Sequence, residues 1–352
     1  MRGTVRLTTM ALALVTIACG GAGAATPGAR HVNVAFIYAA SGVGALDELA
    51  LGARAAAADS AGVTLDVEAP VGPAGSAPAQ VGMFRSAIRT SKDGVALQTN
   101  QPDVFVQPLQ DAHATGVPLV AVDTPPPPSS HVDTYVGNSN FELGQQLATD
   151  MLPAIPAGAA GQVVIGTPIP GFPVMDQRIT GMLQVLRQQR PAVQVVGPID
   201  TTRLPPDNLA AWTAAVQQYP DALAYLAPAD IDAASLAAVE RQTGRHLVVG
   251  AVDIEDAALQ GIRDGLVHTL VSPEHWLKGY IAVRLLIEHA RSGRALPQGW
   301  WNPGTVVVNQ SNVDDIIARQ RDATSRTRWF ASVAARQLAT PAQYVKPLSS
   351  AI

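Results

Sequence analysis

The 352-residue chain has little cysteine, little charge and few aromatic residues. Its one cysteine, Cys19, excludes both an internal disulfide framework and a metal site built from several cysteines. Charged residues make up 15% of the sequence and the net charge is −4, which excludes the basic surface that a nucleic-acid partner requires. After Ile17 no apolar run reaches the roughly 18 residues of a transmembrane helix. With 47% hydrophobic residues, the chain is instead long and apolar enough for two globular domains.

Catalytic and metal-binding motifs are also missing. There is no G-x-S-x-G nucleophile elbow and no glycine-rich phosphate-binding loop. The seven histidines are scattered, and no two of them stand at a metal-ligand spacing. We therefore expect a binding protein that is not an enzyme and that needs neither a metal ion nor another cofactor.

The N-terminus has the pattern of a lipoprotein signal peptide. Arg2 and Arg6 precede an apolar run at 7–17, which is too short to span a membrane as a helix. The run ends in small residues around Cys19, as in a bacterial lipobox, where the cysteine thiol accepts a diacylglyceryl group. We expect Cys19 to be lipidated and the protein to be extracytoplasmic, anchored to the cell membrane. A plain secretory signal with an incidental cysteine is the alternative.

Beyond the signal peptide, short apolar runs alternate with longer stretches rich in alanine and leucine, which is typical of a parallel sheet covered by helices. The expected strands are 32–38, 63–68, 94–98, 117–122, 135–137, 162–166, 193–199, 222–226, 247–252, 267–271 and 305–309. The expected helices are 45–58, 80–89, 104–114, 141–151, 174–188, 209–218, 233–243, 257–264, 276–291 and 312–325. The βα rhythm runs to residue 137 and then restarts, so it indicates a duplicated lobe.

Several short motifs follow one another in a fixed order. They are GVALQ at 94–98, ATGVPLVAVD at 114–123, YVGNSN at 135–140, QRITG at 177–181, VVGAVD at 248–253, IRDG at 262–265 and LKGY at 277–280. In this order and spacing they resemble the type I periplasmic binding proteins, specifically the ribose-binding-like sugar family of ABC importers, over residues 32–312.

The resemblance implies an α/β fold of two doubly wound parallel-sheet lobes, joined by three hinge crossings and closing over a ligand. The expected segments are the signal peptide at 1–19, a flexible tether at 20–30, a first lobe at 31–137 plus 274–298, a second lobe at 138–273 plus 299–330, and a tail at 331–352. The implied function is capture of a small sugar or polyol by a monomer that delivers it to an ABC permease. The alternative is a sensor that presents a sugar or autoinducer to a membrane receptor.

The resemblance also indicates where the ligand binds. In open α/β sheets ligands lie beyond the carboxyl ends of strands, and sugar hydroxyls need charged hydrogen-bond partners in a dry cleft. Asp123, Arg178 and Asp253 match the charged ligand contacts of the family, and both aspartates directly follow expected strands.

Further candidates depart from the family pattern or have a plain structural alternative. They are Tyr38, Ser41, Asn100, Asp230, Glu274, Trp276 and Trp301. Asp230 stands where the family has an asparagine, and Glu274 near a missing glutamine at the second crossing. The alternatives are a core position for Tyr38, a solvated acid at a helix start for Glu274, and packing against the hinge for the Trp300–Trp301 pair.

Overall fold

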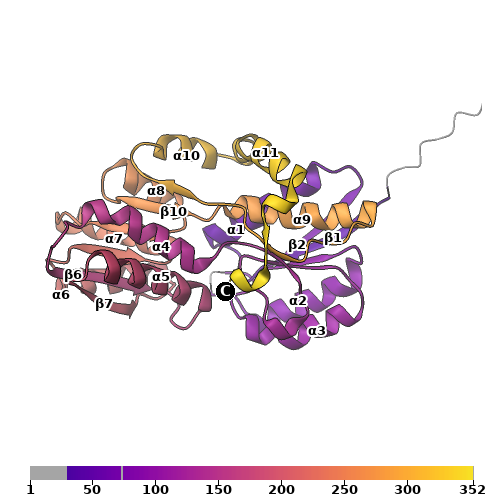
Figure 1. The fold of residues 1–352 in the computed structure, drawn as a ribbon, viewed down its shortest axis with the longest axis horizontal. Coiled ribbons are helices and arrows are strands. Elements are labelled where there is room, and N and C mark those ends of the chain that lie inside the picture. The colour runs from indigo at the N-terminus through magenta and orange to yellow at the C-terminus, as the bar shows by residue number, and fades with distance from the viewer. Residues whose placement is uncertain (1–29, 73, 352) are drawn as a thin grey trace, which may run out of the picture.

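The computed structural model describes residues 30–72 and 74–351, and they form two α/β lobes lying side by side (Figure 1). Cys19 and the expected signal peptide lie outside the described residues. Among the helices of the described part of the chain, none has the length and apolar character needed to cross a membrane.

The first lobe contains a seven-stranded sheet in the order β13-β11-β5-β4-β3-β1-β2. Its strands are β1 (Val32–Ile37), β2 (Val63–Glu68), β3 (Val95–Leu97), β4 (Leu119–Val122), β5 (Thr134–Val136), β11 (Gly299–Trp301) and β13 (Val345–Lys346). All neighbouring pairs are parallel except β11 with β13 at the edge. The helices of this lobe are α1 (Gly44–Ala58), α2 (Ala77–Thr90), α3 (Val106–Ala114), α9 (His275–Ser292) and α11 (Ala323–Ala339).

The second lobe repeats this plan with a six-stranded sheet in the order β12-β10-β9-β8-β6-β7. Its strands are β6 (Gly161–Thr167), β7 (Val193–Asp200), β8 (Ala224–Ala227), β9 (Val249–Val252), β10 (Thr269–Ser272) and β12 (Val306–Val308), the last one antiparallel to β10. Its helices are α4 (Asn140–Met151), α5 (Pro173–Gln189), α6 (Pro205–Gln218), α7 (Asp230–Thr243), α8 (Asp256–Arg263) and α10 (Val313–Gln320). Short 3-10 turns are η1 (Pro102–Phe105), η2 (Pro128–Ser130), η3 (Leu152–Ala154), η4 (Pro341–Gln343) and η5 (Leu348–Ser350).

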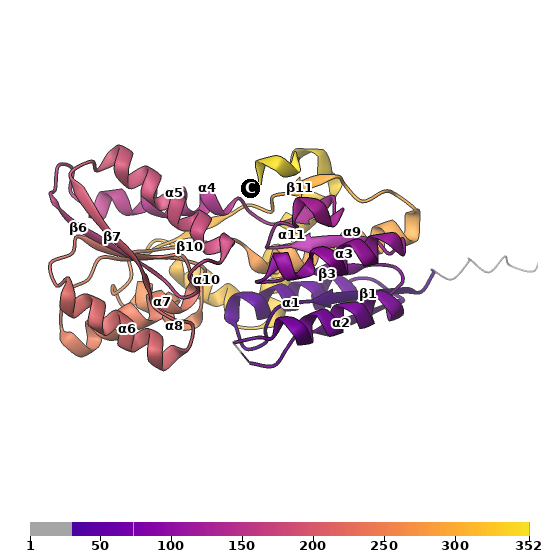
Figure 2. The same ribbon diagram turned by 90° about the horizontal axis from the view of Figure 1, so that it is seen from below.

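Each sheet has a core on both faces, which explains the nearly continuous apolar runs of its strands. In the first lobe α1 and α9 share one core with the sheet, while α2 and α3 pack on the other face. In the second lobe α6, α7 and α8 cover one face and α4 and α5 the other (Figure 2). The expected fold of two doubly wound lobes is therefore confirmed. The two sheets differ in the extra edge strand β13 and in the direction of the strand before it, because β11 is parallel to β5 whereas β12 is antiparallel to β10.

The chain crosses between the lobes after β5, after β10 and after β11, so the third crossing follows residues 299–301 and does not precede them as expected. It also returns to the first lobe between α10 and α11, since α10 packs on α8 while α11 packs on α9. The two helices are separate because the Asp322 carboxylate caps α11 by accepting a hydrogen bond from the Ser325 N–H at 2.7 Å. The single helix expected at 312–325 is thus two helices.

The expected boundaries of the second lobe need correction for residues 299–330. Trp300 and Trp301 belong to β11, which pairs with β5 in the first sheet. Phe330 of α11 stacks on Trp276 of α9 with ring centroids 4.9 Å apart, so α11 is part of the first lobe. The segment 331–352 is not a separate tail either, because α11 continues to Ala339 and β13 extends the first sheet.

Candidate functional site

A cavity of about 380 Å³ lies between the lobes, beyond the carboxyl ends of strands from both sheets. This volume lies within the range of small-molecule sites, about 300–1,000 Å³. The first lobe contributes Leu46, Asn100 and Asp123 to its lining. The second lobe contributes polar residues to the lining, namely Arg178, Asp200, Thr202, Arg203, Asp230 and Asp253, and His275 comes from the start of α9.

Asp123 follows the last residue of β4 in a left-handed backbone conformation with φ 64°. Its N–H donates to the carbonyl of Val136 on the neighbouring strand, and its carboxylate Oδ1 lies 2.5 Å from Lys278 Nζ. Burial by itself raises the pKa of Asp123, but Lys278, His275 and Arg178 outweigh burial and hold this pKa below its ordinary value. Asp123 is therefore a buried, ionised carboxylate.

Asp253 repeats this arrangement in the second lobe. It follows β9 with φ 73°, and its N–H donates to Val271 on the neighbouring strand. Its carboxylate accepts hydrogen bonds from Arg178 Nη1 and from His275 Nε2, each at 2.8 Å. Burial opposes ionisation here too, but Arg178 and His275 hold the pKa of Asp253 well below its usual range. The duplicated strand-end turn thus places one ionised aspartate in each lobe.

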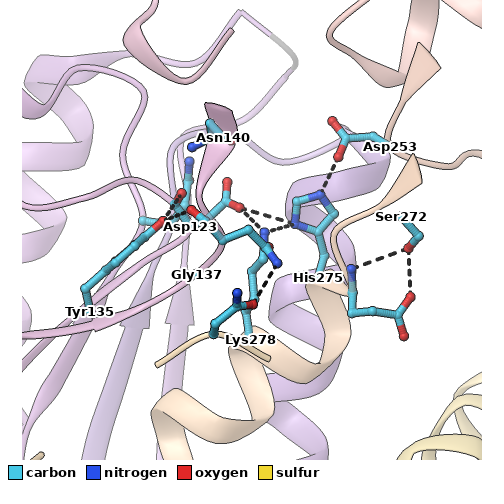
Figure 3. A network of polar contacts seen from close by, with 12 residues as sticks. Asp123, Tyr135, Gly137, Asn140, Asp253, Ser272, His275 and Lys278 are labelled. Carbon is cyan, nitrogen blue, oxygen red and sulfur yellow. Dashed lines mark hydrogen bonds and ion pairs between the residues drawn. The ribbon is translucent and has the colours of Figure 1, made fainter. Parts of the chain in front are cut away.

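His275 and Lys278 connect the two aspartates from α9 (Figure 3). His275 Nδ1 lies 3.5 Å from Asp123 Oδ1 and 3.4 Å from Lys278 Nζ, while its Nε2 bonds Asp253. Both side chains are buried, with 4% and 1% of their surface exposed. They stand three positions apart, so one face of the first turns of α9 carries both.

Arg178 is fixed by further bonds within the second lobe. Its Nε donates to Asn140 Oδ1 at 3.0 Å, and its Nη1 also donates to the carbonyl of Pro228 at 2.6 Å. These bonds hold the guanidinium beside Asp253 at the cavity wall.

The structure places Asp123, Arg178, Asp253, Asn100 and Asp230 of the expected site residues around this cavity. Asp230 forms an ion pair with Arg203, at 2.6 Å and 3.3 Å from its two nitrogens. Whether these residues bind ligand remains a prediction. The sequence reasoning missed Arg203, His275 and Lys278, and only the lysine between apolar residues at the start of α9 gave a signal.

The remaining candidates do not line this cavity, and their contact with a ligand stays a prediction. The Tyr38 hydroxyl donates to Asp47 Oδ1 at 3.1 Å, and the Ser41 hydroxyl donates to the carbonyl of Pro70 at 3.3 Å. Glu274 is buried and paired with Arg319 at 3.0 Å and 3.1 Å, so the alternative of a solvated acid is wrong.

The tryptophans pack the first lobe and do not form a wall of the cavity. Trp276 stacks on Tyr280 with ring centroids 4.9 Å apart. Trp301 donates from Nε1 to Gln337 Oε1 at 3.0 Å, and Trp300 donates to the carbonyl of Gly137 at 2.6 Å. The apolar wall of the cavity comes instead from side chains such as Phe172 and Met175 of the second lobe.

Among curated proteins, the chain is similar to the xylose/arabinose-binding protein XylF of Sulfolobus acidocaldarius, with 23% identity over 265 residues. This match covers 70% of the present chain and 64% of the relative, less than two thirds of that protein's length.

Solved structures share the fold. A solute-binding protein of an ABC transporter from Burkholderia graminis, in complex with D-arabinose, has a TM-score of 0.73 and 24% identity over 81% of this chain and 97% of its own. A solute-binding protein from Agrobacterium vitis with bound D-fucose has a TM-score of 0.73 and 19% identity, covering 80% and 96% of the two chains.

A family model matches most of the chain directly. Residues 34–295 match the model described as the periplasmic binding protein domain, which spans both lobes and includes every charged residue of the cavity. The resemblance predicted from the order of the motifs is therefore confirmed, and the chain belongs to the periplasmic binding protein domain family.

Proposed function

We propose that this protein is the solute-binding component of an ABC importer and captures a small sugar or polyol in the cavity between its lobes. The observation that supports this most is the pair Asp123 and Asp253, one buried ionised carboxylate from each lobe at a single cavity. Carboxylates accept hydrogen bonds from hydroxyl groups, and a charged partner makes these bonds stronger than neutral ones. One ligand that bonds both aspartates favours the closed arrangement of the lobes.

The other lining residues suit a neutral polyhydroxylated ring. Arg178 and Arg203 supply donors for hydroxyl oxygens, while Leu46, Phe172 and Met175 supply an apolar surface for the C–H faces. The names of the similar proteins point to aldoses, because they mention xylose, arabinose and fucose. Aldopentoses and deoxyhexoses are therefore the first ligands to test.

The test is isothermal titration calorimetry with D-arabinose, D-xylose and D-fucose. For the sugar that binds most tightly, Asp123→Asn and Arg178→Ala should weaken binding by about ten- to a hundredfold, since a charge-assisted hydrogen bond contributes about 1.5–3 kcal/mol. The control is Asp264→Asn, which removes half of an exposed pair with Arg241 worth about 0–1 kcal/mol at most. Unchanged affinity in both site variants, or no binding of any sugar, would contradict the proposal.

We also propose that Cys19 anchors the protein by lipidation and that the monomer presents its ligand to a membrane permease from outside the cytoplasm. The support is the single cysteine directly after the apolar run at 7–17. In cell fractionation, Cys19→Ala should move the protein from the membrane to the soluble fraction and leave sugar binding unchanged. Membrane retention of that variant would refute the anchor.

A further inference from the structure

Among the described residues, His275 is the one side chain within ion-pair distance of the cavity aspartates of both lobes. We propose that His275 is a positioning residue for ligand binding. Neutral His275 leaves the Asp123 carboxylate free to bind the ligand, whereas protonated His275 draws this carboxylate away from the cavity. The affinity for the ligand should therefore fall in acid. This inference rests on the proposed capture of a sugar in this cavity.

The neutral form of His275 matches the observed contacts. Nε2 donates to Asp253 Oδ1 at 2.8 Å, which leaves Nδ1 as an acceptor. Lys278 Nζ lies 3.4 Å from Nδ1 and also donates to Asp123 Oδ1. Among the described residues, every polar contact of the Asp123 carboxylate with another side chain is made through Oδ1, so Oδ2 is available to a ligand hydroxyl in the cavity.

Protonation of His275 also changes the charge balance of this cluster. Asp123 and Asp253 carry two negative charges, which Lys278 and Arg178 neutralise. A proton on His275 adds an uncompensated positive charge inside the protein and places it beside the Lys278 ammonium, where like charges repel.

Protonation also changes what Nδ1 can do. It becomes a donor, and the nearest carboxylate oxygen is Asp123 Oδ1 at 3.5 Å. A hydrogen bond to this oxygen turns Asp123 toward α9 and away from the cavity. The ligand and the proton therefore compete for Asp123, and each weakens the binding of the other.

Other titratable groups face His275 from the opposite side. They line a second hollow that His275 also borders, namely Asp47, Glu48, Glu255, Asp256, Glu274, Arg319 and Arg326. Glu255 matters most, because burial and the nearby Asp230 raise its pKa to about 7. Glu255 changes charge in the same pH range as a histidine, so the test must separate the two residues.

The experiment is calorimetry with the tightest-binding sugar among D-arabinose, D-xylose and D-fucose, at pH 7.5 and pH 5.5. Wild-type affinity should fall by about fivefold or more in acid, within the usual range of coupling between two sites. His275→Gln keeps a donor and an acceptor without a titratable group, and it should bind with nearly equal affinity at both pH values. Glu255→Gln is the matched control and should keep the wild-type pH dependence.

A second measurement needs no variant. Wild-type titrations at pH 6 in two buffers with different ionisation heats should show that binding releases protons. An unchanged pH dependence in His275→Gln, its loss in Glu255→Gln, or no proton release would overturn this inference while sugar binding stands. If the wild-type protein binds none of these sugars at either pH, the proposed function fails, and this inference fails with it.

Discussion

The two cavity aspartates combine backbone strain with charge. Asp123 and Asp253 have φ values of 64° and 73°, a region that side chains other than glycine rarely occupy and that costs of order 1–3 kcal/mol. Each is held there by an ion pair and by its own N–H bond to the next strand. The surrounding fold thus offsets the strain, and both carboxylates are positioned at their strand ends without a ligand.

Another buried acid, Asp232, lies at the centre of a hydrogen-bond cluster in the second lobe. Its Oδ1 accepts hydrogen bonds from Thr201, Asn208 and Trp212, whereas its buried Oδ2 has no partner among the described residues. Burial raises the pKa of Asp232 to about 6. The folded state therefore holds the proton more tightly than the unfolded chain, and this contribution to stability is complete below pH ~4 and lost as the pH rises through ~6.

Asp232→Asn removes this titration. Relative to the wild type, the free energy of unfolding of the variant should rise by about 1–2 kcal/mol between pH 5 and pH 8. Urea denaturation at the two pH values measures this change, with the exposed Asp264→Asn as control. If the free energy of unfolding changes equally with pH in Asp232→Asn and in the wild type, ionisation of Asp232 does not destabilise the folded protein.

The sequence allowed some cavity residues to be predicted and not others. Asp123 and Asp253 were predictable because the position after a buried strand is a local feature, which the apolar runs reveal. His275 and Lys278 were not, because their role depends on where the first turn of α9 lies relative to strands far away in the sequence. For Trp301 a cavity position and a core position both stayed open, because burial in a core and exposure at a cavity give the same sequence signal, and the structure places this side chain in the core.

At the level of secondary structure, the contact between α1 and α9 positions His275 and Lys278. The two helices touch through backbone atoms at two glycines. A Cβ atom on Gly279 would lie 1.9 Å from the Leu49 carbonyl oxygen, and one on Gly52 would lie 1.8 Å from the Trp276 carbonyl oxygen. Any side chain at either glycine would force the helices apart.

Gly279→Ala should therefore lower the free energy of unfolding by about 3 kcal/mol or prevent folding, because there is no space for a methyl group between the two helix backbones. Gly82→Ala in α2 is the matched control, since nothing lies within 4 Å of the added Cβ. The control should be stabilised by up to about 1 kcal/mol through helix propensity. Urea denaturation of both variants measures the difference, and equal stability would refute the close contact.

The long helices and central strands were predictable from periodicity, whereas β11 and α11 were not. β11 has three residues, and only its pairing with β5 makes it a strand. In α11 the buried residues are Phe330, Ala334 and Gln337, too few to give a clear apolar face. Their place in the first lobe arises from contacts with α9 and β5, which lie far away in the sequence.

At the level of the whole molecule, the duplication explains why one cavity has two matching halves. In each lobe an aspartate directly follows a parallel strand. The first turns of α9 place His275 and Lys278 beside these aspartates. The segments around the second crossing are tied by further ion pairs, Glu274 with Arg319 and Glu48 with Arg326. His275 thus connects the two aspartates of the lobes beside the cavity, and the Glu274–Arg319 pair joins the second crossing to α10 of the second lobe.

The central claim is that a single sugar bonds both lobes and favours their closed arrangement. Small-angle X-ray scattering of the protein, free and saturated with the sugar that calorimetry identifies, tests it most directly. We expect a smaller radius of gyration in the saturated protein, and no change when the same sugar concentration leaves Asp123→Asn mostly unbound. An unchanged radius of gyration in the wild-type protein, at a concentration where calorimetry shows full occupancy, would contradict the account.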